Sequence, residues 1–143
     1  KVSRRNHRNR PYTSIFPTHI VMSVAGDTNV VGGWLELLYH EAAHHLILSE
    51  AYFVVGTIWD VTNAMNVSIP RQLWHMYLFY FSGEITRGLL ADVGVNYPQT
   101  YIQRNGIYSR YFTLLDEYVL AYMKRETTLA EATRKMIESI YKD

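Results

Sequence analysis

The sequence predicts an α+β fold that is predominantly helical, with a small N-terminal sheet. Four stretches between residues 34 and 141 show helical spacing of apolar residues or helix-capping signals, and one β-rich stretch precedes them. A length of 143 residues fits one domain, and 48% apolar residues can bury a core. We therefore expect one domain over residues 12–143, preceded by a basic flexible tail over residues 1–11.

The N-terminal half contains a strand, a helix and a segment with mixed signals. Residues 15–25 are rich in β-branched and apolar side chains and precede turn formers at 26–29, which predicts one strand and a turn. Apolar residues then recur at helical spacing over about residues 34–51. Residues 53–69 combine apolar side chains with turn formers, and we assign no element to them.

A second long helix is predicted over about residues 71–93. Pro70 fits its first turn, and Gly94 closes it. Glycine inside a helix costs about 1 kcal/mol relative to alanine, so we expect Gly83 and Gly88 to lie where another element packs closely.

The C-terminal part contains a loop and two helices. Residues 96–108 are rich in Tyr and carry turn formers, which predicts a loop. Helices are expected at about residues 109–125 and 128–141. The last helix begins with a capping box formed by Thr128 and Glu131, and an amphipathic stripe follows.

Composition excludes several classes of protein. The 14 basic and 13 acidic residues nearly cancel, which argues against a protein built mainly to bind nucleic acid. The absence of Cys excludes disulfide scaffolds, Cys-ligated metal sites and thiol catalysis. The most apolar run, residues 46–59, contains Ser49 and Glu50 and is too short to be a transmembrane segment. The compartment stays open.

Residues 40–44 read His-Glu-Ala-Ala-His, an HExxH sequence inside the first predicted helix. Side chains four residues apart in a helix differ by about 40° around its axis, so His40 and His44 leave the same face and can share a metal ion. Glu41 lies about 100° around, beside that ion, where a carboxylate can take a proton from metal-bound water. At this composition the motif arises by chance in roughly one chain in seventy, so its surroundings matter.

The surroundings of the motif favour a metal site. Apolar residues occupy nearly every sector of the helix around His40, with only Glu36 and His45 as exceptions, which is typical of a buried helix. Burial of two His and one Glu costs of the order of several kcal/mol unless a metal or hydrogen-bond partners compensate. The alternative is a pair of hydrogen-bonded core histidines.

A catalytic zinc ion needs a third protein ligand and an open position for water. Glu84 is the preferred third ligand, because it lies in the middle of the predicted helix at 71–93 among aromatic and aliphatic residues. A surface pair between Glu84 and Arg87 is the alternative for this residue.

Asp60 is the second candidate for the third ligand. It ends the stretch Gly56-Thr57-Ile58-Trp59-Asp60, which is one residue longer than the Gly-Thr-x-Asp signature of the aspzincins. The metzincin pattern is excluded, because its Gly and His positions are occupied by Ile47 and Glu50.

With these features the chain resembles a gluzincin, the thermolysin-like branch of the zincin metallopeptidases. The resemblance covers about residues 18–93. It implies that His40, His44 and Glu84 bind zinc and that Glu41 is the general base. The expected architecture is then zincin-like, with an active-site helix and a Glu-bearing helix behind a small or truncated N-terminal sheet.

The sequence departs from this family in two respects. Gluzincins place an Asp four residues after the ligand Glu, but Gly88 stands there, so Asp92 or Asp116 is expected to support the site. Zincins also carry a multi-stranded sheet before the active-site helix. We therefore expect either a natural chain with a longer N-terminus or a sheet of one or two strands. The strand at 19–23 would pair with an extended peptide.

The implied reaction is zinc-dependent hydrolysis of a peptide or protein substrate. Zinc lowers the pKa of its bound water towards about 7, and Glu41 accepts the proton as the hydroxide attacks the carbonyl. The oxyanion needs a hydrogen-bond donor, for which Tyr101 is preferred and His75, Tyr97 and Tyr108 are further candidates. The alternatives are an inactive zincin-derived binding module and a helical interaction domain in which HExxH occurs by chance.

Overall fold

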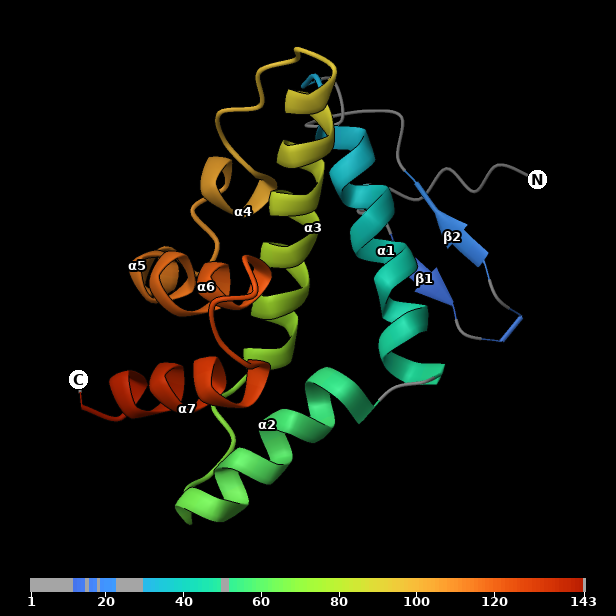
Figure 1. Cartoon of the computed structure of the whole chain (residues 1–143). Coiled ribbons are helices and arrows are strands. Elements are labelled where there is room, and N and C mark those ends of the chain that lie inside the picture. Colours follow the sequence, from blue (N-terminus) through green and yellow to red (C-terminus); the bar gives the residue numbers. More distant parts are fainter. Residues whose placement is uncertain (1–11, 15, 18, 23–29, 50–51, 143) are drawn as a thin grey trace.

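The fold is predominantly helical with a small sheet, as the sequence predicts (Figure 1). The predicted tail at 1–11 and the predicted turn at 26–29 lie outside the described residues. Among the described residues, no helix combines the length and the hydropathy that a membrane-spanning segment requires. The computed structural model describes residues 12–14, 16–17, 19–22, 30–49 and 52–142.

The sheet is an antiparallel hairpin of two short strands. β1 (Tyr12–Ser14) pairs with β2 (His19–Val21), and Thr13 lies opposite Ile20. Of the single strand predicted at 15–25, the structure confirms residues 19–21 as β2, whereas residues 16–17 form a turn and β1 was not predicted. A three-residue strand such as β1 carries too little alternation to be recognised in the sequence.

Two long helices, α1 (Gly33–Ser49) and α3 (Leu73–Asp92), lie side by side, with the hairpin against α1 (Figure 1). They run antiparallel, so the second half of α1 faces the start of α3. The predicted end of α3 is confirmed. Gly94 has φ +75°, and its N–H donates to Ala91 O at 2.9 Å.

The segment 53–69 forms a further helix, α2 (Tyr52–Met65), where the sequence showed only mixed signals. Thr57 and Thr62 satisfy their hydroxyl groups by donating to backbone carbonyls four residues earlier, at 2.5 and 2.9 Å. Ile58 is buried in the core, and α2 packs on the C-terminal helix. Tertiary packing thus overrides the local turn propensity.

The C-terminal part is more broken than predicted. The final helix, α7 (Leu129–Ile140), is confirmed, and its cap is Thr128, whose Oγ1 accepts the N–H of Glu131 at 3.2 Å. The preceding segment consists of short pieces: α4 (Tyr101–Arg104), a 3₁₀ turn (Ser109–Tyr111), α5 (Phe112–Leu114), a π-helical turn (Leu115–Val119) and α6 (Leu120–Met123).

The main hydrophobic core lies between α2, α3 and the C-terminal pieces. None of the described α1 side chains belongs to it. The contact between α1 and α3 instead contains two groups of buried polar side chains, and these form the site. The fully buried members of the core include Leu73, Met76, Tyr77, Leu115, Val119, Met136 and Ile137.

Candidate metal site

Three histidines meet between α1 and α3. His40 and His44 leave the same face of α1, as predicted, and His75 joins them from the first turn of α3. The Nε2 atom of His40 lies 3.2 Å from Nε2 of His44 and 3.2 Å from Nε2 of His75. Two nitrogens bound to one tetrahedral zinc ion are about 3.3–3.4 Å apart, so both distances from His40 suit ligands of a single ion. One ligand atom from each of the three histidines lies within 4.8 Å of the others.

Burial keeps these imidazoles neutral. His40 is 3% exposed, and burial, together with the neighbouring His44 and His75, lowers its pKa to about 3. Burial likewise lowers the pKa of His75 to about 4 and shifts the pKa of His44 downward. At neutral pH the rings are therefore uncharged, which is the form that binds metal.

A cavity of about 820 Å³ opens in front of the histidines. The ring of Phe79 stacks on His40 with 3.7 Å between centroids, and Tyr101 stacks on Phe79 at 5.6 Å. The wall is thus largely aromatic and uncharged. Besides the three histidines and Glu41, the residues that line it are Tyr12, Thr13, Leu37, Gln72, Trp74, Phe79, Tyr101, Asn105, Ile107 and Tyr108.

Glu41, the predicted general base, lines this cavity and is 6% exposed. Its Oε2 accepts a hydrogen bond from Thr13 Oγ1 at 2.7 Å. The hairpin therefore holds the Glu41 carboxylate beside the histidines. Sequence reasoning missed Thr13, because it precedes the predicted strand and its partner lies 28 positions away.

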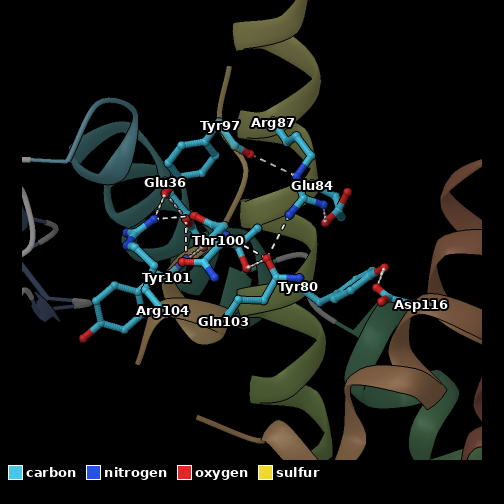
Figure 2. Close-up of polar contacts among 11 residues, drawn as sticks. Glu36, Tyr80, Glu84, Arg87, Tyr97, Thr100, Tyr101, Gln103, Arg104 and Asp116 are labelled. Atoms are coloured by element: carbon cyan, nitrogen blue, oxygen red, sulfur yellow. Dashed lines mark hydrogen bonds and ion pairs between the residues drawn. The ribbon is translucent and has the colours of Figure 1, made fainter. Parts of the chain in front are cut away.

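Glu84, the predicted third ligand, lies elsewhere. Its carboxylate pairs with Arg87, the arrangement that was the alternative for this residue (Figure 2). Glu84 follows His75 by nine positions on α3, which places it about 13–14 Å further along the axis and on the opposite side of the helix. Glu84 does not line the cavity, so the structure brings His75, and not Glu84, to His40 and His44.

The aspartates named from the sequence also lie away from the histidines. Asp60 is exposed on α2, and Asp92 is exposed at the end of α3. Asp116 accepts a hydrogen bond from the Tyr80 hydroxyl at 2.7 Å (Figure 2). None of these three carboxylates lines the cavity, and none contacts a histidine of the cluster.

Two of the predicted oxyanion donors, Tyr101 and Tyr108, line the cavity. The Tyr108 hydroxyl donates to Gln72 Oε1 at 2.9 Å and lies 3.4 Å from Nδ1 of His75. Tyr97 is 3% exposed and turns towards α1 instead. His75, proposed as a donor, is one of the three clustered histidines.

A second polar centre surrounds Glu36, one turn before His40 on α1. Glu36 is 0% exposed, and its carboxylate accepts hydrogen bonds from the Tyr97 hydroxyl and from the backbone N–H of Tyr101, the latter at 2.8–2.9 Å (Figure 2). Arg104 donates to the Tyr97 hydroxyl at 2.8 Å. Burial raises the pKa of Glu36, although these contacts oppose the rise.

Gly83 lets α3 approach this second centre. A Cβ at Gly83 would lie 2.6 Å from Thr100 Cγ2 and 3.0 Å from Glu36 Oε1, so the predicted close packing is confirmed. The same prediction for Gly88 is wrong, because no atom lies within 4 Å of a Cβ there. Gly83 also shows that this level of α3 faces Glu36 and not the histidines.

Comparison of the chain with protein-family models, with curated proteins and with solved structures gives no match. The resemblance to gluzincins therefore rests on the HExxH sequence and its surroundings. The donor set in the structure consists of three histidines, which differs from the two His and one Glu that the resemblance implies.

Proposed function

We propose that the chain is a zinc-dependent hydrolase of peptide bonds, with His40, His44 and His75 as metal ligands and Glu41 as general base. The convergence of three neutral imidazoles beside a carboxylate in one cavity carries this proposal. A small sheet, an HExxH helix and a second helix that supplies a ligand also support a zincin-like arrangement.

The donor set fits zinc. Neutral imidazole is a common zinc ligand, and three protein ligands leave a fourth position for water or substrate. A bound Zn²⁺ ion would supply Lewis-acid chemistry, acidifying water and polarising a carbonyl group. Imidazole also suits copper, nickel and cobalt, so the metal content must be measured.

The chain's own residues supply the rest of the proposed reaction. Thr13 engages one oxygen of the Glu41 carboxylate, and the other oxygen is left to accept a proton from water. The Tyr101 and Tyr108 side chains line the cavity and carry hydroxyl donors suited to a developing oxyanion. The aromatic wall of Trp74 and Phe79 limits water and favours peptides with bulky apolar side chains.

The test compares wild type with Glu41→Gln. Metal content is measured by plasma mass spectrometry after equilibration with Zn²⁺ and dialysis, and cleavage is measured on a peptide library. We expect about one zinc per chain in both proteins and a loss of about 10²–10⁴-fold in cleavage in the variant. Absence of bound metal in wild type would refute the proposal. Metal binding without cleavage would favour the inactive binding module.

A further inference from the structure

His75 differs from His40 in what holds its second ring nitrogen. Nδ1 of His75 lies 3.4 Å from the Tyr108 hydroxyl, and that hydroxyl donates to Gln72 Oε1 at 2.9 Å. Nδ1 of His40, in contrast, is buried and has no hydrogen-bond partner among the described residues. A chain of hydrogen bonds therefore leads from Gln72 through Tyr108 to His75.

The chemistry of these groups sets the direction of the chain. A Gln side-chain oxygen can only accept, so the single hydroxyl proton of Tyr108 goes to Gln72. The Tyr108 oxygen can then only accept from His75, which places the ring proton on Nδ1. In a neutral imidazole this leaves a lone pair on Nε2, the atom that lies 3.2 Å from Nε2 of His40.

The backbone of both partners is unusual. Gln72 has φ +61° and Tyr108 has φ +59°, a left-handed conformation that costs non-glycine residues about 1 kcal/mol or more each. Such strain tends to occur at functional sites. In its strained conformation the Gln72 carbonyl also accepts the N–H of His75 at 3.0 Å, so Gln72 positions both the backbone and the ring of this residue.

We propose that Gln72 and Tyr108 are positioning residues that fix the Nδ1–H tautomer of His75 and so direct its Nε2 lone pair to the metal. The role of the metal in this proposal rests on the proposed function, whereas the tautomer of His75 does not depend on it. Partners of this kind usually change metal affinity or activity by about 10- to 100-fold when removed.

The first test reads the tautomer in the metal-free chain. Long-range ¹H–¹⁵N spectra at neutral pH distinguish protonated from unprotonated ring nitrogens, and a His75→Gln sample assigns the signals. We expect Nδ1–H in wild type and in Gln72→Glu, which keeps an acceptor oxygen. Gln72→Met removes the acceptor and frees the Tyr108 proton to turn to Nδ1, so we expect an increased Nε2–H population.

The second test measures Zn²⁺ affinity by competition with a chromophoric chelator. We expect Tyr108→Phe and Gln72→Met to bind about 10- to 100-fold more weakly, and Gln72→Glu to retain affinity. Tyr101→Phe is the matched control, since it removes a hydroxyl from the same cavity without touching the chain of hydrogen bonds. Circular dichroism checks folding, and if Tyr108→Phe does not fold, Gln72→Met carries the test.

An Nε2–H tautomer of His75 in wild type would overturn the inference, as would a tautomer that Gln72→Met leaves unchanged. Equal affinity in Tyr108→Phe and Tyr101→Phe would also overturn it. If wild type binds no zinc, the proposed function fails, and the tautomer of the metal-free chain still decides this inference.

Discussion

The contact between α1 and α3 contains two polar centres, one turn apart on α1. They differ in whether their buried polar groups find hydrogen-bond partners within the protein. Around Glu36, a carboxylate meets the Tyr97 hydroxyl and the backbone N–H of Tyr101, so an acceptor faces donors. Around His40, three imidazole nitrogens of the same kind face one another at the edge of a cavity.

The difference distinguishes a structural centre around Glu36 from a candidate ligand centre around His40. Buried polar groups that find complementary partners within the protein tie its elements together. Nε2 of His40 faces two further Nε2 atoms, and a single ring proton on it can engage the lone pair of only one of them. A metal ion would satisfy these lone pairs, whereas the Glu36 carboxylate already has its partners within the protein.

The largest effect is expected from Glu36→Ala, which removes the shared acceptor of the structural centre. The Tyr97 hydroxyl and the Tyr101 N–H lose their buried partner, and the Arg104 cation loses its nearby opposite charge. Loss of one member of such a buried group costs about 3–5 kcal/mol. Urea unfolding of the metal-free chain measures this change in the free energy of unfolding.

Glu36→Gln is the control for this prediction, because the amide keeps an acceptor oxygen in nearly the same shape. It should cost clearly less than Glu36→Ala. If Glu36→Ala lowered the free energy of unfolding by less than about 1 kcal/mol, the centre around Glu36 would not be structural.

The corresponding change at the ligand centre is His75→Ala, compared with Glu84→Ala. A four-ligand zinc site is worth about 10–16 kcal/mol, or roughly 2.5–4 kcal/mol for each ligand, which corresponds to a loss of about 60- to 700-fold in Zn²⁺ affinity for His75→Ala. Glu84→Ala should retain the affinity, because Glu84 pairs with Arg87 away from the cavity. Chelator competition measures both, and the reverse ranking would restore Glu84 as the third ligand.

The two centres also respond to pH with opposite sign. The pKa values of His40 and His75 are about 3 and about 4 in the folded chain, below the usual 6.5, so between these values the unfolded chain binds more protons. Stability therefore falls as pH falls below about 6.5, by up to about 1.4 kcal/mol per pH unit for each histidine. The raised pKa of Glu36 acts the other way and favours the folded chain as pH falls.

Urea unfolding of the metal-free chain between pH 7 and 5 tests this pH dependence. His75→Gln should reduce the slope, because it removes one of the groups that protonate only on unfolding. Glu36→Gln should leave the histidine contribution in place. An unfolding free energy of Glu36→Gln that does not change between pH 7 and 5 would contradict the neutral, buried state of the histidines, because this variant lacks the opposing contribution of Glu36.

Sequence reasoning succeeded where the signal is local. The periodicity of α1, the C-terminal end of α3 and the N-terminal cap of α7 are set by neighbouring residues, and HExxH spacing alone places His40 and His44 on one face. The start of α3 was not predicted correctly, because Pro70 precedes its first turn and the helix begins at Leu73. The α2 helix was missed because its stability comes from packing on α7 and not from local propensity.

The proposed third ligand, His75, could not be predicted in this way. His75 reaches the cluster because α1 and α3 pack antiparallel, so that the end of one helix faces the start of the other. Glu84, a Glu within an apolar helix, gave the stronger local signal, but its ion pair with Arg87 explains its presence there. Glu36 was recognisable in the sequence as a charge in an apolar helix. Its partners could not be predicted, because Tyr97 and Tyr101 lie 61 and 65 positions later in the chain.

A smaller effect is expected from Thr13→Val, which removes the hydroxyl that holds Glu41. Supporting partners of this kind contribute about tenfold or more to activity, and Thr13 lies outside the cluster of three histidines. We expect kcat to fall about tenfold at unchanged zinc content. Thr13→Ser keeps the hydroxyl and should restore activity; if it does not, the hydroxyl is not the cause.

The smallest effect separates two glycines of the same helix. Gly88→Ala meets no atom within 4 Å and should stabilise the chain by about 0.4–1 kcal/mol, because alanine loses less backbone entropy on forming a helix. Gly83→Ala forces a methyl group against Thr100 and Glu36 and should destabilise the chain by about 1–3 kcal/mol. Thermal unfolding of both variants measures the difference.

Because Gly83 contacts the structural centre and not the histidines, its substitution should lower stability while Zn²⁺ affinity of the folded chain is retained. Loss of affinity in Gly83→Ala would mean that the two centres are coupled through α3.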